Sequence, residues 1–147
     1  MPSPSFAVST EIRAAPETVF AYVADLSKHR EWAANELRVE PLDNSPLGVG
    51  KKYHSTATVG GRTFHADLQI TQYNAPTLFA FSGHDETGKF SHRFTFEPIE
   101  NRTRVVRTVS FDLSLPQYAF YLVALNRVRL PAARGALDKL KERLEKI

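Results

Sequence analysis

Two ionisable side chains stand on strand faces that are otherwise apolar. His92 alternates with phenylalanines in FSHRF, and Arg107 alternates with valines in VVRTV. An inward histidine can act as a general base, and an inward arginine can stabilise an anion such as an enolate. Each also has a structural interpretation. His92 could be a hydrogen-bonded core residue. Arg107 could extend from the strand end into solvent, or the face assigned to it could be wrong. The two strands follow one another, so a turn near Glu100-Asn101 would bring His92 and Arg107 within a few residues of being opposite.

Other combinations that could do chemistry are weaker. His84, Asp85 and Glu86 are neighbours in a predicted turn, and neighbours in sequence do not converge on a metal without distant ligands. His65 and Asp67 lie two apart on a polar strand face, with no third ligand in evidence. Serine, histidine and aspartate all occur, but no spacing marks an activated nucleophile. We therefore predict no metal site and no cofactor.

Composition limits the classes further. The 147 residues are 42% hydrophobic and include no cysteine, which excludes disulfides and thiolate chemistry and fits the cytoplasm. The N-terminus lacks the pattern of a signal peptide, and the longest apolar run, YAFYLVAL at 118–125, is far shorter than the ~20 residues of a membrane span. Residues 101–147 carry 10 Lys and Arg against 4 Asp and Glu. This basic balance fits a solvated helix face better than an anionic partner, so we expect no nucleic-acid binding and no stable membrane insertion.

Alternation and helical spacing predict the elements that position these side chains. A strand over 6–13 precedes a helix that opens at Pro16 and a second short helix capped by Asp25 and ending near Trp32. A long amphipathic helix is predicted over about 117–146, with a kink or break near Arg127 because Pro131 removes a helical hydrogen bond. Between them we predict strands over 37–42, 52–59, 62–73, 77–82, 89–97 and 103–113.

Strands this regular and this closely spaced indicate an antiparallel meander, and its apolar face must be buried against the helix stripe. We therefore predict an α+β fold, a curved antiparallel sheet of about seven strands that grips the long C-terminal helix. A strongly curved sheet cannot close fully on the helix, so a cavity between them is expected. Punctuating Pro and Gly with no linker indicate a single domain over 1–147.

Two stretches resemble a known superfamily. IRAAPETVFAYVADLSKHREW at 12–32 is similar to the N-terminal signature of polyketide cyclase/dehydrase-like proteins in the helix-grip class, the START/Bet v 1-like (SRPBCC) superfamily. FEPIENRTRVVRTVSF at 96–111 resembles the last hairpin of that family. The resemblance implies a large cavity for an apolar or amphipathic small molecule. It implies no catalytic residue, because these motifs are structural and the relatives include cyclases, lipid and sterol carriers, quinone-binding proteins and hormone receptors.

Alternation then selects the residues expected to contact a ligand. Aromatic side chains would supply apolar area, and a few polar groups would fix the ligand's orientation. Asn126, on the helix stripe, could instead relieve the break at Pro131, and Trp32 could simply pack at the cavity mouth. The expected ligand-binding residues are Trp32, Tyr53, Phe64, Phe79, Phe81, His92, Phe94, Arg107 and Asn126.

Three functions follow as hypotheses. The leading one is a carrier or sensor that binds a lipid, polyketide-like or quinone-like compound. The second is a cyclase or dehydratase with His92 as general base and Arg107 stabilising an enolate. The third is a partner-binding module acting through 118–125, which could form a homodimer. The segment 116–134 itself could be core beneath the short helices, a dimer contact or a membrane-touching lid.

Overall fold

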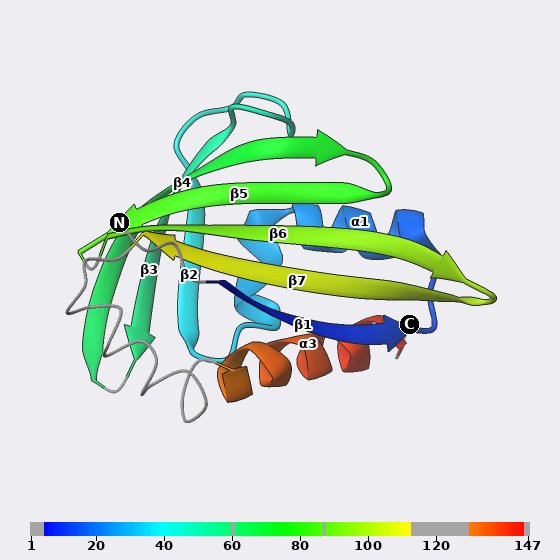
Figure 1. The fold of residues 1–147 in the computed structure, drawn as a ribbon. Helices are drawn as coiled ribbons and strands as arrows, with labels where there is room; N and C mark the ends of the chain where they lie inside the picture. The colour runs from blue at the N-terminus through cyan, green and yellow to red at the C-terminus, as the bar shows by residue number, and fades with distance from the viewer. Residues whose placement is uncertain (1–4, 60, 87, 113–129, 146–147) are drawn as a thin grey trace.

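The computed structural model describes residues 5–59, 61–86, 88–112 and 130–145. Within these ranges, seven strands and three helices follow the predicted order, with the short helices between the first two strands and the long helix last (Figure 1). The helices are α1 (Pro16–Ala24), the 3-10 helix η1 (Leu26–Glu31) and α3 (Leu130–Glu145). The strands are β1 (Ser5–Ile12), β2 (Glu36–Pro41), β3 (Lys52–Val59), β4 (Arg62–Asn74), β5 (Leu78–Asp85), β6 (Gly88–Ile99) and β7 (Arg102–Asp112).

All seven strands form one antiparallel sheet in the order β1-β7-β6-β5-β4-β3-β2. Consecutive strands from β2 to β7 are neighbours, and β1 adds to the free edge of β7. Both β6 and β7 are therefore interior strands. Glu100 and Asn101 form the turn between them, and Glu100 takes a φ of 53° in the left-handed region that tight turns use. The predicted position of this turn is confirmed.

Local sequence explains how the short helices are placed. Pro16 opens α1, where its fixed φ suits the first turn and its missing N–H is not needed. Asp25 ends α1 and caps η1, because its carboxylate accepts a hydrogen bond from the backbone N–H of Ser27 at 3.2 Å. One aspartate thus sets the bend that directs η1 towards β2.

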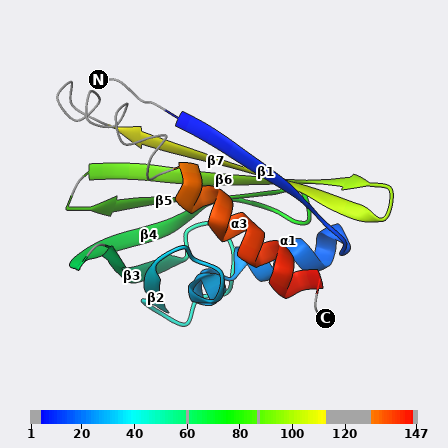
Figure 2. The ribbon, with the colours of Figure 1, turned by 90° about the horizontal axis from the view of Figure 1, so that it is seen from below.

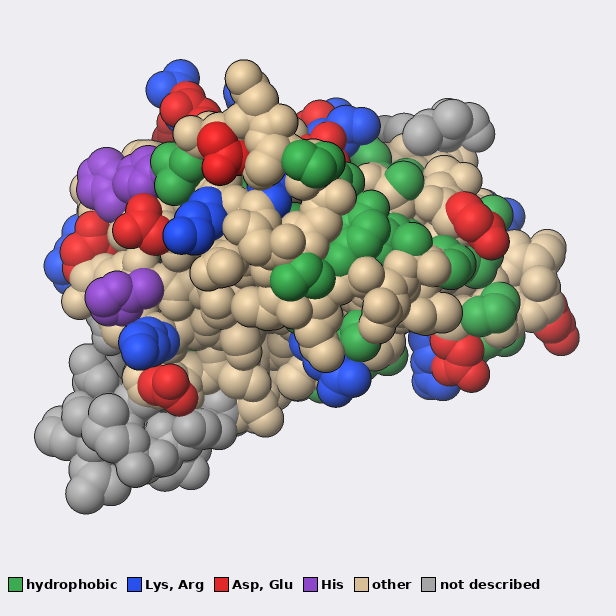
Figure 3. All heavy atoms as spheres, turned by 90° about the horizontal axis from the view of Figure 1, so that it is seen from above, with side chains coloured by type: hydrophobic (Ala, Val, Ile, Leu, Met, Phe, Trp, Pro, Cys, Tyr) green, Lys and Arg blue, Asp and Glu red, His purple; other side chains and the backbone are tan. Residues whose placement is uncertain are grey.

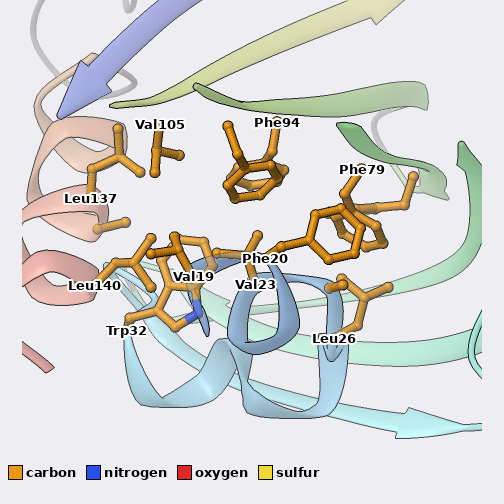
Figure 4. Close-up of a cluster of buried hydrophobic side chains, with 14 of the residues drawn as sticks. Val19, Phe20, Val23, Leu26, Trp32, Phe79, Phe94, Val105, Leu137 and Leu140 are labelled. Atoms are coloured by element: carbon orange, nitrogen blue, oxygen red, sulfur yellow. The ribbon is translucent and has the colours of Figure 1, made fainter. Parts of the chain in front are cut away.

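The core lies between the sheet and the three helices (Figure 4). From α1, Val19, Phe20 and Val23 point towards the sheet, and Leu137 and Leu140 of α3 meet them from the side. Phe20 forms edge-to-face pairs with aromatic rings of the sheet, with centroids 5.2–6.4 Å apart. The largest fully buried side chains are Trp32, Phe79, Phe94, Ile12, Leu26, Ile70, Leu137, Leu140, Val19, Val23, Val105 and Thr103.

The C-terminal helix α3 lies on the same side of the sheet as α1, along β1 (Figure 2). Polar contacts hold it there from two directions. Glu145 accepts the backbone N–H of Arg13 at 2.8 Å, and Lys141 donates to the carbonyl of Glu11 at 2.6 Å. Arg143 of α3 donates to Glu31 of η1, which also accepts a hydrogen bond from the hydroxyl of Tyr22 in α1, so one cluster joins α1, η1 and α3.

The predicted helix-grip fold is confirmed. The largest shift of a strand end concerns β5, predicted to end at Ser82 but extending to Asp85, because His84 and Asp85 pair with Lys89 and Gly88 of β6 instead of forming an open loop. The described part of the long helix begins at Leu130. The kink predicted near Arg127 and most of the segment 116–134 lie outside the described residues. No helix in the described ranges is long and apolar enough to cross a membrane.

Candidate functional site

The two ionisable residues on the inward face, His92 of β6 and Arg107 of β7, contact each other. Phe94 lies opposite Arg107 and Val109 lies opposite His92, so the pair is diagonal across neighbouring strands. The Nε and Nη2 atoms of Arg107 lie 3.3 Å and 3.1 Å from Nδ1 of His92. A guanidinium can only donate, so Nδ1 is the acceptor and the proton of the neutral ring is on Nε2. The predicted proximity is confirmed.

Aromatic rings surround this pair. The guanidinium carbon of Arg107 lies 5.6 Å from the ring centre of Trp32 and 5.5 Å from that of Phe94, within the range of a cation–π contact. The His92 ring is stacked on Phe81, with centroids 4.8 Å apart and planes 9° from parallel. Arg107 is therefore half-buried, with its guanidinium packed against aromatic rings and not extended into solvent. Its charge is held against the inner aromatic rings.

A third basic residue, His29 of η1, approaches the pair from the helix side. Its Nε2 lies 2.8 Å from the carbonyl oxygen of Val23, and its ring is 4.6 Å from that of Trp32. The sequence analysis did not select His29. A signal was available, because Leu26, His29 and Trp32 recur at steps of three, the period of a 3-10 helix that buries one face.

The electrostatics of the three groups share one cause. Burial lowers the pKa of His29 to about 4, helped by the charge of Arg107 although the carbonyl of Val23 opposes it. Burial, then the charges of Arg107 and His29, lower the pKa of His92 well below its usual value. Burial also lowers the pKa of Arg107, to about 10. Both histidines are therefore neutral at pH 7, and Arg107 carries the charge of the cluster.

Within the described residues, no carboxylate forms an ion pair with Arg107. The acid with an electrostatic effect on His29, Asp25, is already engaged by Ser27 at the start of η1. A second donor in this region, the indole Nε1–H of Trp32, is buried and has no hydrogen-bond partner among the residues that the structure describes. This part of the interior therefore has an excess of hydrogen-bond donors and of positive charge.

The inward face of the sheet is packed at one end and accessible at the other. Phe94 and Phe96 on β6 and Val105 on β7 are buried, with exposed fractions of 0–3%. Further along the same strands, Phe90 of β6 and Phe111 of β7 are half-buried, although Val109 of β7 is covered. His92 and Arg107, also half-buried, lie at the boundary between the two ends.

The predicted ligand-binding residues fall into three groups. Trp32, Tyr53, Phe79, Phe81 and Phe94 are 0–4% exposed, so in this structure protein atoms cover them. Phe64 is half-buried on β4, beside Arg62, and His92 and Arg107 are half-buried at the boundary. Asn126 lies outside the described residues. Burial of Tyr53, helped by the charge of Asp25, raises its pKa to about 12, so its hydroxyl stays protonated.

An open groove of about 640 Å³ lies on the outward face of the sheet, and its lining also includes Phe90 and Phe111, whose side chains face inward. A row of outward residues with small serines at its centre forms it: Lys52, Gln69, Ser82, Ser91 and Ser110. Exposed histidines gather near one end of this face (Figure 3). His54 and His65 stack at 5.7 Å, and His54 meets Asp67 at 3.3 Å. Across the described ranges no three His, Asp or Glu side chains are grouped to hold a metal. We place the candidate site at the inward cluster, where the perturbed groups converge.

Comparisons with known proteins agree with this architecture. Residues 3–145 match the family model described as polyketide cyclase/dehydrase and lipid transport. No curated protein is similar enough in sequence to count as a match.

Solved structures share the fold at low sequence identity. The Zhui aromatase/cyclase from a Streptomyces species has a TM-score of 0.79 at 15% identity, covering 99% of this chain and 95% of that one. The protein TTHA0849 from Thermus thermophilus has a TM-score of 0.78 at 19% identity, covering 96% and 97%. A START superfamily protein from Mycobacterium smegmatis has a TM-score of 0.75 at 13% identity, covering 97% of each chain. At these identities the likeness establishes the fold alone.

Proposed function

Because the chain belongs to the polyketide cyclase/dehydrase and lipid transport family, we propose that it binds a hydrophobic or amphipathic small molecule on the inward face of its sheet. The observation that carries this proposal is the change in packing along β6 and β7. Phe94 and Val105 are fully covered, whereas Phe90, Phe111 and the His92–Arg107 pair keep accessible surface while facing inward. Aromatic area beside a few polar groups is the usual composition of a small-molecule site.

The alternative function, a cyclase or dehydratase, has less support from this geometry. A general base needs a free lone pair and a pKa near the working pH. The lone pair of His92 on Nδ1 accepts from Arg107, and burial lowers the pKa of the ring well below its usual value. Both features favour His92 as a hydrogen-bond donor through Nε2. We therefore propose binding as the function, with Arg107 and His92 as orienting groups.

The single tryptophan supplies a reporter for the test. Trp32 lies next to Arg107, so a ligand that reaches the cluster changes its fluorescence, whereas a ligand in the outward groove does not contact it. We would titrate the protein with decanoic acid and decanol, follow Trp32 emission and measure melting temperature. A saturable change in emission with a rise in melting temperature supports the proposal, because a ligand bound only by the folded state raises stability.

The control variant is Ser91→Trp, which places a large ring in the outward groove and introduces a second fluorophore there. Melting shifts in this variant should equal those of the wild type if binding is on the inward face. Loss of the shift in Ser91→Trp, or unchanged Trp32 emission at saturating ligand, would move the site to the groove. No melting shift with either compound, or with a native lipid extract, would reject a binding function.

A further inference from the structure

Arg107 is a charged side chain on the inward face that has no acidic partner within the described part of the chain. Its polar contact there is the neutral ring of His92, and its other neighbours are the aromatic faces of Trp32 and Phe94. Arg107 is half-buried, and a charge that is partly removed from water is costly unless a group such as a carboxylate compensates it. The described residues supply none to Arg107.

The donors outnumber the acceptors throughout this cluster. A guanidinium has five N–H groups, and those of Arg107 that do not point at Nδ1 of His92 have no acceptor among the described residues. Because Nδ1 accepts, the Nε2–H of His92 is a further donor. His29, the third basic group, gives its Nε2–H to the carbonyl of Val23 and adds no acceptor that Arg107 contacts.

We infer that the ligand carries an acidic group, a carboxylate or an ionised phenol or enol, which pairs with Arg107 while its apolar part lies against the half-buried rings of Phe90 and Phe111. This inference rests on the binding function proposed above and specifies its ligand class. A planar carboxylate can accept two parallel hydrogen bonds from a guanidinium, which combines charge neutralisation with a fixed orientation. His92 holds the guanidinium from one side and so acts as a positioning residue.

The interior favours an anion over a neutral acceptor for a physical reason. A hydroxyl or ketone would satisfy one donor but leave the positive charge uncompensated in a site where the rings screen it poorly. A carboxylate accepts the hydrogen bonds and also compensates the positive charge. The measurable consequence is that the protein binds an acid more tightly than the alcohol with the same carbon skeleton.

The experiment compares matched pairs, decanoic acid with decanol and 2-naphthoic acid with 2-naphthalenemethanol, by titration calorimetry at pH 7.5. The wild type should prefer the acid of at least one pair at least tenfold. Arg107→Met should lose that preference by weakening acid binding at least tenfold while leaving alcohol binding within about twofold. Arg104→Met, an exposed arginine on the outward face of the same strand, should retain it.

Each outcome decides between the proposals. Equal binding of acid and alcohol, or a preference that survives Arg107→Met, overturns the acidic-ligand assignment but leaves the binding function intact. No binding of any of the four compounds by the wild type overturns the binding function and this inference together. If Arg107→Met does not fold, Arg107→Lys replaces it. That variant keeps the charge but loses the planar fork, and a reduced preference for the acid supports the inference, whereas an unchanged preference rejects paired hydrogen bonding.

Discussion

Replacing Arg107 with methionine should make the ligand-free protein more stable. Burial lowers the pKa of Arg107 to about 10. Since each tenfold change in proton affinity is worth about 1.4 kcal/mol, this corresponds to about 3 kcal/mol of desolvation. Against it stand the contacts with Trp32 and Phe94 and the hydrogen bond to His92, together about 2 kcal/mol. We therefore expect Arg107→Met to raise the free energy of unfolding by about 1 kcal/mol.

Urea unfolding at pH 7.5 measures this change directly, and thermal unfolding should show a melting temperature about 2–4 °C higher. Arg104→Met is the matched control, because its side chain is exposed on the outward face of the same strand, and it should stay within about 0.5 kcal/mol of the wild type. If Arg107→Met is less stable than Arg104→Met by about 1 kcal/mol or more, the guanidinium is already compensated in the folded chain and the reasoning about its charge is wrong.

Three further predictions concern stability. Burial lowers the pKa of His29 to about 4, so between pH 7 and pH 5 the unfolded state binds a proton that the folded state does not. The free energy of unfolding should therefore fall by about 2 kcal/mol over this range, and His92 acts in the same direction. Urea midpoints that do not fall as the pH is lowered would contradict this. Gly83→Ala should lower the free energy of unfolding by about 1–3 kcal/mol, because a Cβ there would meet Leu68 at 2.7 Å and the ring of Phe90 at still closer range. The control is Gly135→Ala in α3, which has open space around it and should be neutral or stabilising in thermal unfolding of both variants. Thr103→Val should lower the free energy of unfolding by about 1–3 kcal/mol, because the buried Thr103 hydroxyl donates to the carbonyl of Ala14 at 2.7 Å and valine would leave that carbonyl without a donor. An unchanged urea midpoint would show that water replaces the hydrogen bond.

Much of the fold could be predicted from local patterns. Alternation in 52–59 gave the limits of β3, and Pro16 and Asp25 gave the start of α1 and the cap of η1, because these features depend on neighbours in sequence. Strand ends were harder to place. The extension of β5 to Asp85 depends on pairing with β6, which polar turn residues do not reveal.

The site could be predicted only in part, because alternation assigns a face but not a depth. Phe79 and Phe90 both face inward, yet Phe79 is fully covered, with Phe20 of α1 packed against it, while Phe90 remains half-buried. Arg107 was ambiguous for a related reason. Its contacts with Trp32 of the helix side and with Phe94 and His92 of β6 depend on tertiary packing, which the local pattern around Arg107 does not reveal. His29 was missed because its burial comes from the bend after α1.

The difference in packing between the two ends of β6 and β7 has an evolutionary consequence. The covered end contains the residues that keep the chain folded, so folding does not have to wait for an occupant. The accessible end, from Phe90 to Phe111, contributes less to that stability. Under the proposed binding function, substitutions there change ligand selectivity with little penalty to the scaffold, which offers one physical route by which a single architecture comes to serve many small molecules.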